Sequence, residues 1–343
     1  MKVGLIGTGA IAGKHAQAYK NIGYQLTACT DRTAERGRKF AEAWGAEFIA
    51  TSEELAARAD IDFLDVCTFP GYRLAAVELG AKYGKHVLVQ KPMAVDLEAA
   101  TRMIAVAHNA GIQLGVVSQH RFDDSVLFLK RAIAAGRLGK ILQADAYVKW
   151  YRTAEYYARP VKGSWAGEGG GALISQAIHQ VDVLLYLIGA VEEVFGYWHL
   201  GALHKIESED LVCAVMRYAS GATGVIQAST ALWPGYPERY EIHGTKGSAI
   251  ITGDQLTTWD VQDDSGEPAP LAQQAKSGAS DPMAISLMPF ERQLSDFGEA
   301  CKANRLAASS GIEGYRALQL VRSIYDSCAE GKKIKLDPQL PAS

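Results

Sequence analysis

The chain has 343 residues, of which 48% are hydrophobic and 21% are charged, and its formal net charge is −3. This length predicts two domains, and the composition is that of an ordinary globular protein. The small net charge gives no electrostatic reason to expect a nucleic acid or an anionic membrane as a partner.

The five cysteines are scattered along the chain and form no C-x-x-C pair. This pattern is typical of reduced thiols in a cytosol, and it excludes both a disulfide framework and a zinc site of that type. The chain enters an apolar strand almost at Met1, without a signal-peptide pattern, and no apolar run approaches the length of a membrane span. We therefore expect a cytoplasmic protein.

The first predicted strand breaks into a turn that reads Gly7-Thr8-Gly9-Ala10-Ile11-Ala12 and then continues as a helix. In a dinucleotide-binding unit, the first glycine of this G-x-G-x-x-A pattern allows the tight turn and the second lets the backbone approach a pyrophosphate. The small third residue lets the helix pack on the strand. The amino end of the helix offers N–H groups to the phosphates. All six residues are expected to bind the cofactor.

The next β-like run ends at Asp31, close to the spacing of about 20 residues at which such folds place a ribose-binding acid. Asp31 is expected to accept hydrogen bonds from the adenosine ribose hydroxyls and to repel a 2′-phosphate, which favours NAD over NADP. Arg32 complicates this choice, because its guanidinium could stack on adenine or hold that phosphate. The alternative for Asp31 is an ordinary turn residue at a strand end.

Strands and helices then alternate to about residue 120. Strands are predicted at 61–67, 86–90 and 112–118, and helices at 34–44, from 52, at 73–83 and at 97–109. Such alternation predicts a mostly parallel, doubly wound sheet, so residues 1–120 are expected to form an α/β Rossmann domain. Loops after its strands lie at the carboxyl edge, where a dinucleotide binds. Further cofactor contacts are expected from Thr68, Phe69, Gln90, Lys91, Gln119 and Trp165.

After residue 120 the pattern changes. Helices are predicted at 125–135 and 171–188, and β-like runs at 141–150, 191–200, 211–218, 224–230, 240–243 and 249–252. This predicts an α+β domain over residues 121–343, built on a large, mainly antiparallel open sheet. Residues 261–282 are expected to form a surface loop. The tail helices, 290–303 and 311–328, could pack back on the first domain.

Lys91 follows a predicted strand and precedes Pro92. The residue before a proline is pushed out of the helical region, which holds this lysine extended at the sheet edge, and the bond to the proline could be cis. A lysine beside a nicotinamide can hydrogen-bond a carbinol oxygen and stabilise the charge that develops on it. The alternative is a surface lysine in a loop.

Three glycines, 169–171, precede the helix that carries Ser175, His179 and Asp182. Their spacing of i, i+4 and i+7 predicts that the three polar side chains share one face. An imidazole suits proton transfer near neutral pH. Asp182 could orient His179 or anchor the helix, and both alternatives stay open. No third ligand accompanies this pair, so no metal site is expected.

The segment from Tyr151 to Trp165 gathers tyrosine, arginine, lysine and tryptophan side chains. Such side chains can grip a polyhydroxylated ring by hydrogen bonds and stacking. They could equally belong to a loop that packs on the sheet.

Taken together, these motifs resemble the Gfo/Idh/MocA family, the glucose–fructose oxidoreductase and inositol dehydrogenase group. The resemblance rests on the Gly7–Ala12 turn, Asp31, Gly84–Pro92, Arg121-Phe122, Gly169–Asp182 and Gly244–Ser248. It implies a sugar or cyclitol site between the two domains, where Lys91 stabilises the developing oxyanion and His179 transfers the proton. It also implies an open sheet that mediates oligomerisation. The substrate contacts it implies are Lys91, Arg121, Arg152, Tyr157, Lys162, Ser175, Gln176, His179 and Asp182.

Three positions depart from the family pattern. Gln90 replaces the glutamate of Glu-Lys-Pro, and Ser175 replaces an aspartate four residues before the histidine. The usual Thr-Pro-Asn-x-x-His loop reads Thr68-Phe69-Pro70-Gly71-Tyr72-Arg73. The chain therefore lacks two of the carboxylates that relatives place beside the reacting groups.

The function expected is that of a reversible NAD-dependent dehydrogenase that oxidises a ring hydroxyl of a sugar, glycoside or cyclitol. A homodimer or homotetramer is expected, with no nucleic-acid or membrane partner. One alternative is a glycosidase that oxidises the sugar transiently, eliminates the leaving group and returns the hydride. Another is a non-enzymatic NAD-binding sugar sensor, which would not need the pair of Lys91 and His179. Fold alone does not decide among these alternatives.

Overall fold

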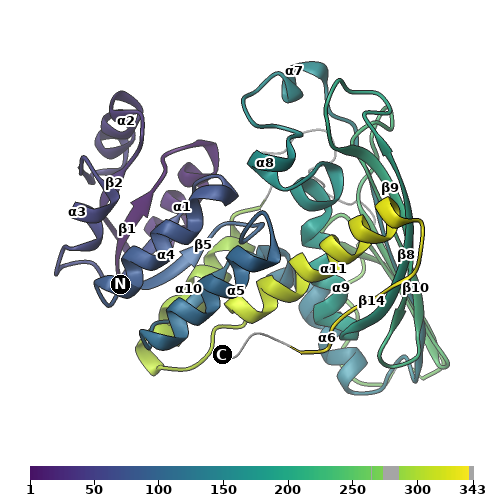
Figure 1. Cartoon of the computed structure of the whole chain (residues 1–343). Coiled ribbons are helices and arrows are strands. Elements are labelled where there is room, and N and C mark those ends of the chain that lie inside the picture. Colours follow the sequence, from purple (N-terminus) through teal and green to yellow (C-terminus); the bar gives the residue numbers. More distant parts are fainter. Residues whose placement is uncertain (264, 273–285, 340–343) are drawn as a thin grey trace. The chain divides into compact units, whose positions relative to one another are not determined.

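The computed structural model describes residues 1–263, 265–272 and 286–339, which divide into two compact units (Figure 1). The described residues of unit 1 fall within Met1–Gln119 and Ser286–Tyr315, and those of unit 2 within His120–Ile285 and Arg316–Gln339. Unit 1 therefore includes a segment from the C-terminal part of the chain.

Unit 1 is built on a six-stranded parallel sheet in the order β3-β2-β1-β4-β5-β6. Its strands are β1 Lys2–Ile6, β2 Gln25–Thr30, β3 Glu47–Phe48, β4 Phe63–Val66, β5 His86–Val89 and β6 Leu114–Val116. Its helices are α1 Ala10–Asn21, α2 Ala34–Trp44, α3 Ser52–Ala56, α4 Arg73–Lys82, α5 Leu97–Asn109 and α10 Met288–Ala303, with a short 3-10 turn at Pro70–Tyr72. This strand order is the one that characterises dinucleotide-binding folds, and it confirms the predicted doubly wound domain.

Helices cover both faces of this sheet, so its central strands are buried and mostly apolar, with Asp65 of β4 as a buried polar exception. Helices α1 and α10 pack against each other, as do α4 and α5. Phe297 of α10 meets Phe63 of β4 edge to face, with ring centroids 5.2 Å apart. A side chain at Gly115 would collide with the Phe297 ring, so the glycine in β6 lets α10 lie close to the sheet. The sheet core therefore depends on a helix from near the end of the chain.

Unit 2 is built on an eight-stranded sheet in the order β13-β12-β11-β7-β10-β9-β8-β14, antiparallel except between β7 and β10. Its strands are β7 Ile141–Lys149, β8 Val191–Leu200, β9 Glu209–Tyr218, β10 Thr223–Ser229, β11 Arg239–Gly244, β12 Gly247–Thr252, β13 Gln255–Val261 and β14 Ile334–Lys335. Its helices are α6 Asp124–Ala134, α7 Ala154–Tyr157, α8 Trp165–Glu168 and α9 Ile178–Ile188. A 3-10 turn, Gln119–Phe122, and helix α11, Gly311–Glu330, each belong partly to unit 1 and partly to unit 2. The sheet confirms the predicted antiparallel architecture.

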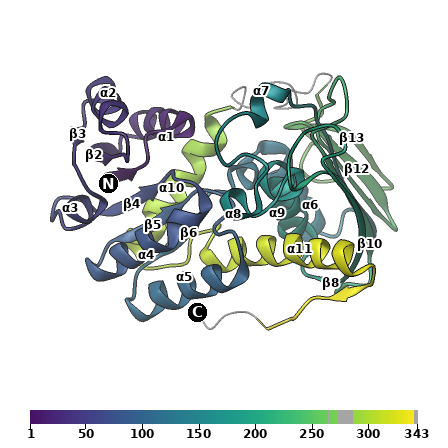
Figure 2. The same cartoon turned by 45° about the horizontal axis from the view of Figure 1, so that its top comes forward.

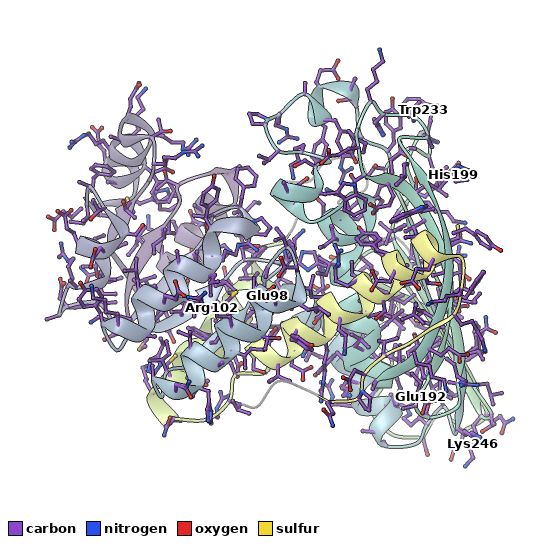
Figure 3. The ribbon with its side chains drawn as sticks, viewed as in Figure 1. Glu98, Arg102, Glu192, His199, Trp233 and Lys246 are labelled. Atoms are coloured by element: carbon purple, nitrogen blue, oxygen red, sulfur yellow. The ribbon has the colours of Figure 1, made fainter. Side chains whose placement is uncertain are left out.

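Helices α6, α9 and α11 lie on one face of this sheet (Figure 2). Side chains on the opposite face stand in the open: Tyr197 is 69% exposed and Val215 is 54% exposed. His199 projects from β8 on that same face (Figure 3). Among the described residues of unit 2, one face of the large sheet is thus buried under helices and the other is left bare, as expected for an open sheet.

The structure also differs from the prediction in local detail. The helix expected over 171–188 begins with a π-helical turn, Leu173–Ala177, before α9. The helix expected from Ser52 does begin there, and its cap is Thr51, whose hydroxyl accepts from the Glu54 N–H. Strand β13 was not expected and occupies the start of the predicted loop at 261. The part of that loop at 264 and beyond 272 lies outside the described residues.

One stretch, Trp165–Ile188, is long and apolar enough to cross a membrane, contrary to the expectation that no run approached that length. Within this stretch, the 18-residue apolar window is 78% buried inside the protein, counted over the described residues. Such burial is what a core helix shows, so the stretch is explained by its packing.

Candidate active site

The carboxyl ends of the parallel strands in unit 1 bring the predicted cofactor residues to one edge. Gly7 has a φ of 93°, and its N–H donates to the Thr30 carbonyl at 2.9 Å. A Cβ at Gly7 would lie 3.2 Å from the carbonyl of Cys67, so the turn requires glycine there. A Cβ at Gly9 would meet nothing within 4 Å, and no side chain caps the amino end of α1. These features fit a backbone that a pyrophosphate can approach.

Asp31, at the end of β2, is held by several donors. Its carboxylate accepts from the N–H and the hydroxyl of Thr8, both at 2.8 Å, and from the Thr33 N–H at 2.7 Å. Arg36 adds a forked pair through Nε at 3.1 Å and NH2 at 2.8 Å. Burial acts to raise the pKa of Asp31, but these hydrogen bonds outweigh burial and lower it. The carboxylate is therefore ionised at neutral pH.

The Arg36 guanidinium bonds to both Asp31 oxygens, so any ligand hydroxyl that approached this carboxylate would have to share it with Arg36. Its side chain is 55% exposed, so moving it costs little. Arg32 is exposed beside it. Sequence reasoning considered Arg32 and missed Arg36, because the third residue of a predicted helix carried no separate signal.

Two buried polar atoms at this edge have no hydrogen-bond partner among the described residues. They are the Thr68 hydroxyl, after β4, and the side-chain carbonyl oxygen of Gln119, after β6. Buried polar groups are nearly always paired, so such atoms are suited to a polar ligand. Phe69, beside Thr68, is 43% exposed. With the glycine turn and Asp31, these residues fit a dinucleotide.

Lys91 follows β5 at the same edge, and the turn around it is tightly held. The bond from Lys91 to Pro92 is cis. Arg73, which stands where the family pattern has histidine, donates to the carbonyl oxygens of Thr68, Gln90 and Pro92. Its guanidinium is buried and so ties the loop after β4 to the loop after β5. The side-chain oxygen of Gln90 accepts from the Lys91 N–H at 3.2 Å.

Behind this turn, donor atoms of His15, Asp65 and Cys67 lie within 4.8 Å of one another. The distance from His15 Nδ1 to Asp65 Oδ2 is 2.6 Å, which is a hydrogen bond. Two ligands of one zinc ion would stand about 3.3 Å apart, given ordinary bond lengths and tetrahedral geometry. The cluster is therefore explained by hydrogen bonding, and we assign it no metal.

In unit 2, the predicted substrate residues Lys162, Ser175 and Gln176 belong to one polar network. The Lys162 ammonium and the Ser175 hydroxyl, the latter at 3.3 Å, both donate to Glu168. Burial acts to lower the pKa of Lys162, but the charges of Tyr156 and Glu168 raise it overall. Gln176 donates to the Tyr156 hydroxyl at 2.6 Å. The network thus alternates donors and acceptors, as hydroxyl recognition requires.

Two other predicted substrate residues have defined partners near this network. Arg152 donates to the Gln176 side-chain oxygen at 3.3 Å, and its guanidinium lies 4.9 Å from the Trp150 ring centroid. The Tyr157 hydroxyl lies 2.6 Å from that of Thr230, and burial raises its pKa. Tyr156, the neighbouring tyrosine, is the one that contacts Gln176.

His179 is the second residue of α9, and its ring meets that of His120 edge to face with centroids 5.1 Å apart. His120 in turn pairs with Asp123 through Nδ1 at 2.7 Å. Asp182 accepts two hydrogen bonds from Arg121, each 2.7 Å long. A π-helical turn, Leu173–Ala177, lies within the stretch for which the expectation assumed α-helical spacing. Ser175 contacts Glu168, His179 contacts His120, and Asp182 contacts Arg121.

Sequence reasoning missed several residues that shape this region. Glu168 directly precedes the three glycines, and this position was the sequence signal that could have identified it. Glu209 had none, because it reaches the glycines from β9. Its carboxylate accepts from the N–H groups of Gly171 and Leu173, both at 2.7 Å, and burial raises its pKa to about 7 although these hydrogen bonds lower it. A Cβ at Gly171 would collide with the Glu209 carbonyl oxygen, which accounts for one of the three glycines.

Trp165, the one predicted cofactor residue in unit 2, begins α8. Its backbone N–H donates to the Glu207 carboxylate at 2.6 Å, and its indole N–H donates to the Glu207 carbonyl at 3.1 Å. The ring also packs edge to face on Tyr325, with centroids 5.3 Å apart. Its orientation within unit 2 is therefore fixed.

Comparisons with known proteins match this architecture. Residues 1–118 match the model of the oxidoreductase family with an NAD-binding Rossmann fold, and residues 126–250 match the Gfo/Idh/MocA C-terminal domain. The chain is 28% identical to a myo-inositol 2-dehydrogenase from Thermotoga maritima, over 98% of this chain and 99% of that protein. It is 27% identical to a 1,5-anhydro-D-fructose reductase from Ensifer adhaerens, over 98% and 99% respectively.

Among solved structures, the WlbA dehydrogenase from Bordetella pertussis in complex with NADH and UDP-GlcNAcA is 29% identical. The superposition covers 98% of this chain and 99% of that one, with a TM-score of 0.86. The two family models together cover most of the chain and fall in both of its units. The chain therefore belongs to the Gfo/Idh/MocA family of oxidoreductases.

Proposed function

We propose that the protein is a reversible NAD-dependent dehydrogenase that oxidises a ring hydroxyl of a sugar, glycoside or cyclitol to a ketone. The observation that carries the proposal is the turn at Lys91, which Arg73 and Gln90 hold at the carboxyl edge of the parallel sheet. An ammonium group there can stabilise the negative charge that develops on a hydroxyl oxygen during oxidation. The names of the relatives, an inositol dehydrogenase and an anhydrofructose reductase, support the same substrate class.

Bound NAD would supply the hydride acceptor. The residues proposed to hold it are Gly7, Thr8, Gly9, Ala10, Ile11, Ala12, Asp31, Arg32, Thr68, Phe69, Gln90, Lys91, Gln119 and Trp165. His179 is proposed to take the proton of the reacting hydroxyl, because an imidazole can accept and release a proton near neutral pH. Lys91 then holds the oxygen as it becomes a carbonyl.

The remaining substrate contacts are proposed to come from Arg121, Arg152, Tyr157, Lys162, Ser175, Gln176 and Asp182. Of these, Lys162, Ser175 and Gln176 meet in the network with Glu168 and Tyr156. Such a network offers donors and acceptors to vicinal hydroxyls without leaving a charge unpaired. Arg121 and Asp182 already form a buried ion pair with each other, so we propose that they support the position of the other substrate-binding residues.

Cofactor choice rests on Asp31. We expect Asp31→Ser to weaken NADH binding about tenfold, because the ribose hydroxyls lose a charged acceptor. NADPH binding should weaken less or improve, since the carboxylate no longer faces a 2′-phosphate. Calorimetric titration with each cofactor measures both effects, with Asp60→Ser, an exposed acid of the same unit, as the control. Equal losses for the two cofactors would contradict NAD selectivity.

His179→Gln should lower kcat about a hundredfold while the affinity for NADH stays unchanged, because only proton transfer is lost. The decline of activity below neutral pH should also disappear, since no imidazole is left to protonate. The matched control is His199→Gln on the bare face of the sheet, which should keep the parent pH profile. A pH profile of His179→Gln like that of the parent would remove His179 from the proton-transfer role.

The reaction is tested by following the absorbance of reduced nicotinamide with NAD, and separately NADP, across inositols, free sugars and glycosides. Appearance of NADH with one substrate group supports the dehydrogenase and names its class. Silence across the panel together with tight NAD binding would overturn it. Release of the aglycone without net NADH would then indicate the glycosidase, and its absence the sensor.

We also propose the division of labour expected from the sequence, with residues 1–120 binding the cofactor and 121–343 binding substrate and forming a homodimer or homotetramer. The bare face of the large sheet, with Tyr197 and Val215 exposed, supports an oligomer. A cytoplasmic location is proposed as well. Light scattering of the purified chain measures the assembly directly.

A further inference from the structure

We infer that Gln90 is a positioning residue for Lys91, and that the buried pair of Asp65 and His15 fixes the direction in which the Gln90 amide points. The inference rests on the proposed role of Lys91, but its central prediction concerns a proton on His15 and can be tested without substrate. Gln90 is the position at which this chain departs from the glutamate of its family.

The four residues form one hydrogen-bonded chain inside unit 1. His15 Nδ1 lies 2.6 Å from Asp65 Oδ2, and His15 Nε2 lies 2.8 Å from Gln90 Nε2. Gln90 Oε1 accepts from the Lys91 N–H at 3.2 Å. His15 and Asp65 are fully buried and Gln90 is 6% exposed, so water cannot easily substitute for any of these partners.

The donors and acceptors around His15 are compatible with only one placement of its proton and one orientation of the Gln90 amide. Asp65 Oδ2 also accepts from the Tyr19 hydroxyl at 2.8 Å, and Cys67 Sγ lies 3.7 Å from the other oxygen, so Asp65 serves only as an acceptor. The proton between His15 and Asp65 therefore sits on His15 Nδ1. A neutral ring then presents a bare Nε2, which must accept from the NH2 group of Gln90.

That contact leaves the Gln90 oxygen facing Lys91. If the amide were reversed, its NH2 group would face the Lys91 N–H, and two donors would oppose each other. If His15 carried both protons, its Nε2–H would face the Gln90 NH2 group with the same result. The tautomer of His15 thus determines whether the Lys91 N–H can donate to the Gln90 side-chain oxygen. This hydrogen bond fixes the backbone position from which the lysine side chain extends.

The glutamate of the family pattern cannot make this arrangement with a neutral ring of the same tautomer. In Gln90→Glu, a carboxylate oxygen would replace the NH2 group against a bare Nε2, so two acceptors would meet. His15 must then gain a second proton or the glutamate must be protonated. The groups that face His15 are Asp65, Tyr19, Cys67 and, from α10, the ring of Phe290, which carries no titratable atom.

The test is a long-range ¹H–¹⁵N NMR spectrum of the full chain at neutral pH, with the His15 signals assigned through His15→Gln. We expect the parent to show a neutral ring protonated at Nδ1, and Gln90→Glu to show either an imidazolium or a shared carboxyl proton. An Nε2–H tautomer or an imidazolium in the parent would overturn the inference.

Gln90→Met removes both amide contacts without adding charge and tests positioning itself. We expect the Lys91 amide proton to exchange faster, and kcat to fall about tenfold with KM for the sugar and NADH affinity little changed. The matched control is Gln17→Met, at a half-buried glutamine of α1 whose amide donates to Asn21. An unchanged exchange rate of the Lys91 amide proton in Gln90→Met would overturn the inference, whether or not the enzyme oxidises sugars. A protein that gives the expected spectra but is inactive on every substrate would contradict only the proposed function.

Discussion

Replacing Lys91 with alanine should reduce turnover by about 10³-fold, because the developing negative charge on the substrate oxygen loses its charged donor. Binding of NADH should persist with at most a small loss, since Lys91 supplies one of many proposed contacts and the glycine turn and Asp31 are untouched by the change. The substrate KM should change much less than kcat, because the lost interaction strengthens only as the carbonyl forms. Steady-state kinetics and calorimetric titration of NADH measure the two effects separately.

The control for this variant is Lys82→Ala. Lys82 lies in the same unit on α4, where its side chain is 58% exposed and pairs with Glu53. It should leave both kcat and cofactor affinity unchanged. Lys91→Ala with full turnover would remove Lys91 from the reaction. A loss of NADH affinity equal to the loss of turnover would instead show that the turn, and not the ammonium group, had been disrupted.

The fold of unit 1 was predictable because its signals are local. Its central strands β1, β4 and β5 carry mostly apolar residues, helices α2 and α5 are amphipathic, and Gly7 marks the turn between the first two elements. Helix α10 was expected over 290–303, with its packing back on this domain left open, and it completes the sheet core through Phe290 and Phe297. Its neighbours lie far away along the chain, and a helix-period pattern does not say which sheet the helix will cover.

The candidate site was predictable to the extent that its residues lie within motifs. Lys91 and His179 belong to such motifs. Arg73 and Glu209 act through contacts with residues far away in the sequence. Arg36 acts through the orientation of its side chain toward Asp31, which the sequence does not specify. Glu209 reaches the glycines from β9, and no spacing rule joins the two segments. The π-helical turn was missed because one extra residue per turn leaves little trace in a pattern of period 3.6.

Asp182→Asn should destabilise the protein by about 3–5 kcal/mol, because the buried Arg121 guanidinium loses the counter-charge of the Asp182 carboxylate. Both side chains are 3% exposed, and the Asp182 carboxylate accepts from Nε and NH2 of Arg121. An asparagine presents one acceptor and one donor to the same two N–H groups, so one of them meets another donor. The midpoint of thermal unfolding measures the loss, and Asp260→Asn, an exposed acid on β13, should cause none.

This variant also decides between the two roles that the sequence left open for Asp182, which are orienting His179 and anchoring helix α9. If the carboxylate anchors α9, the double variant Arg121→Met/Asp182→Leu should recover most of the lost stability, since a buried ion pair can be replaced by apolar side chains of similar volume. If it orients His179 instead, Asp182→Asn should lower kcat and flatten the pH profile with little change in the unfolding midpoint. The forked pair with Arg121 favours the anchor, because it uses both carboxylate oxygens and ties α9 to the turn that carries His120.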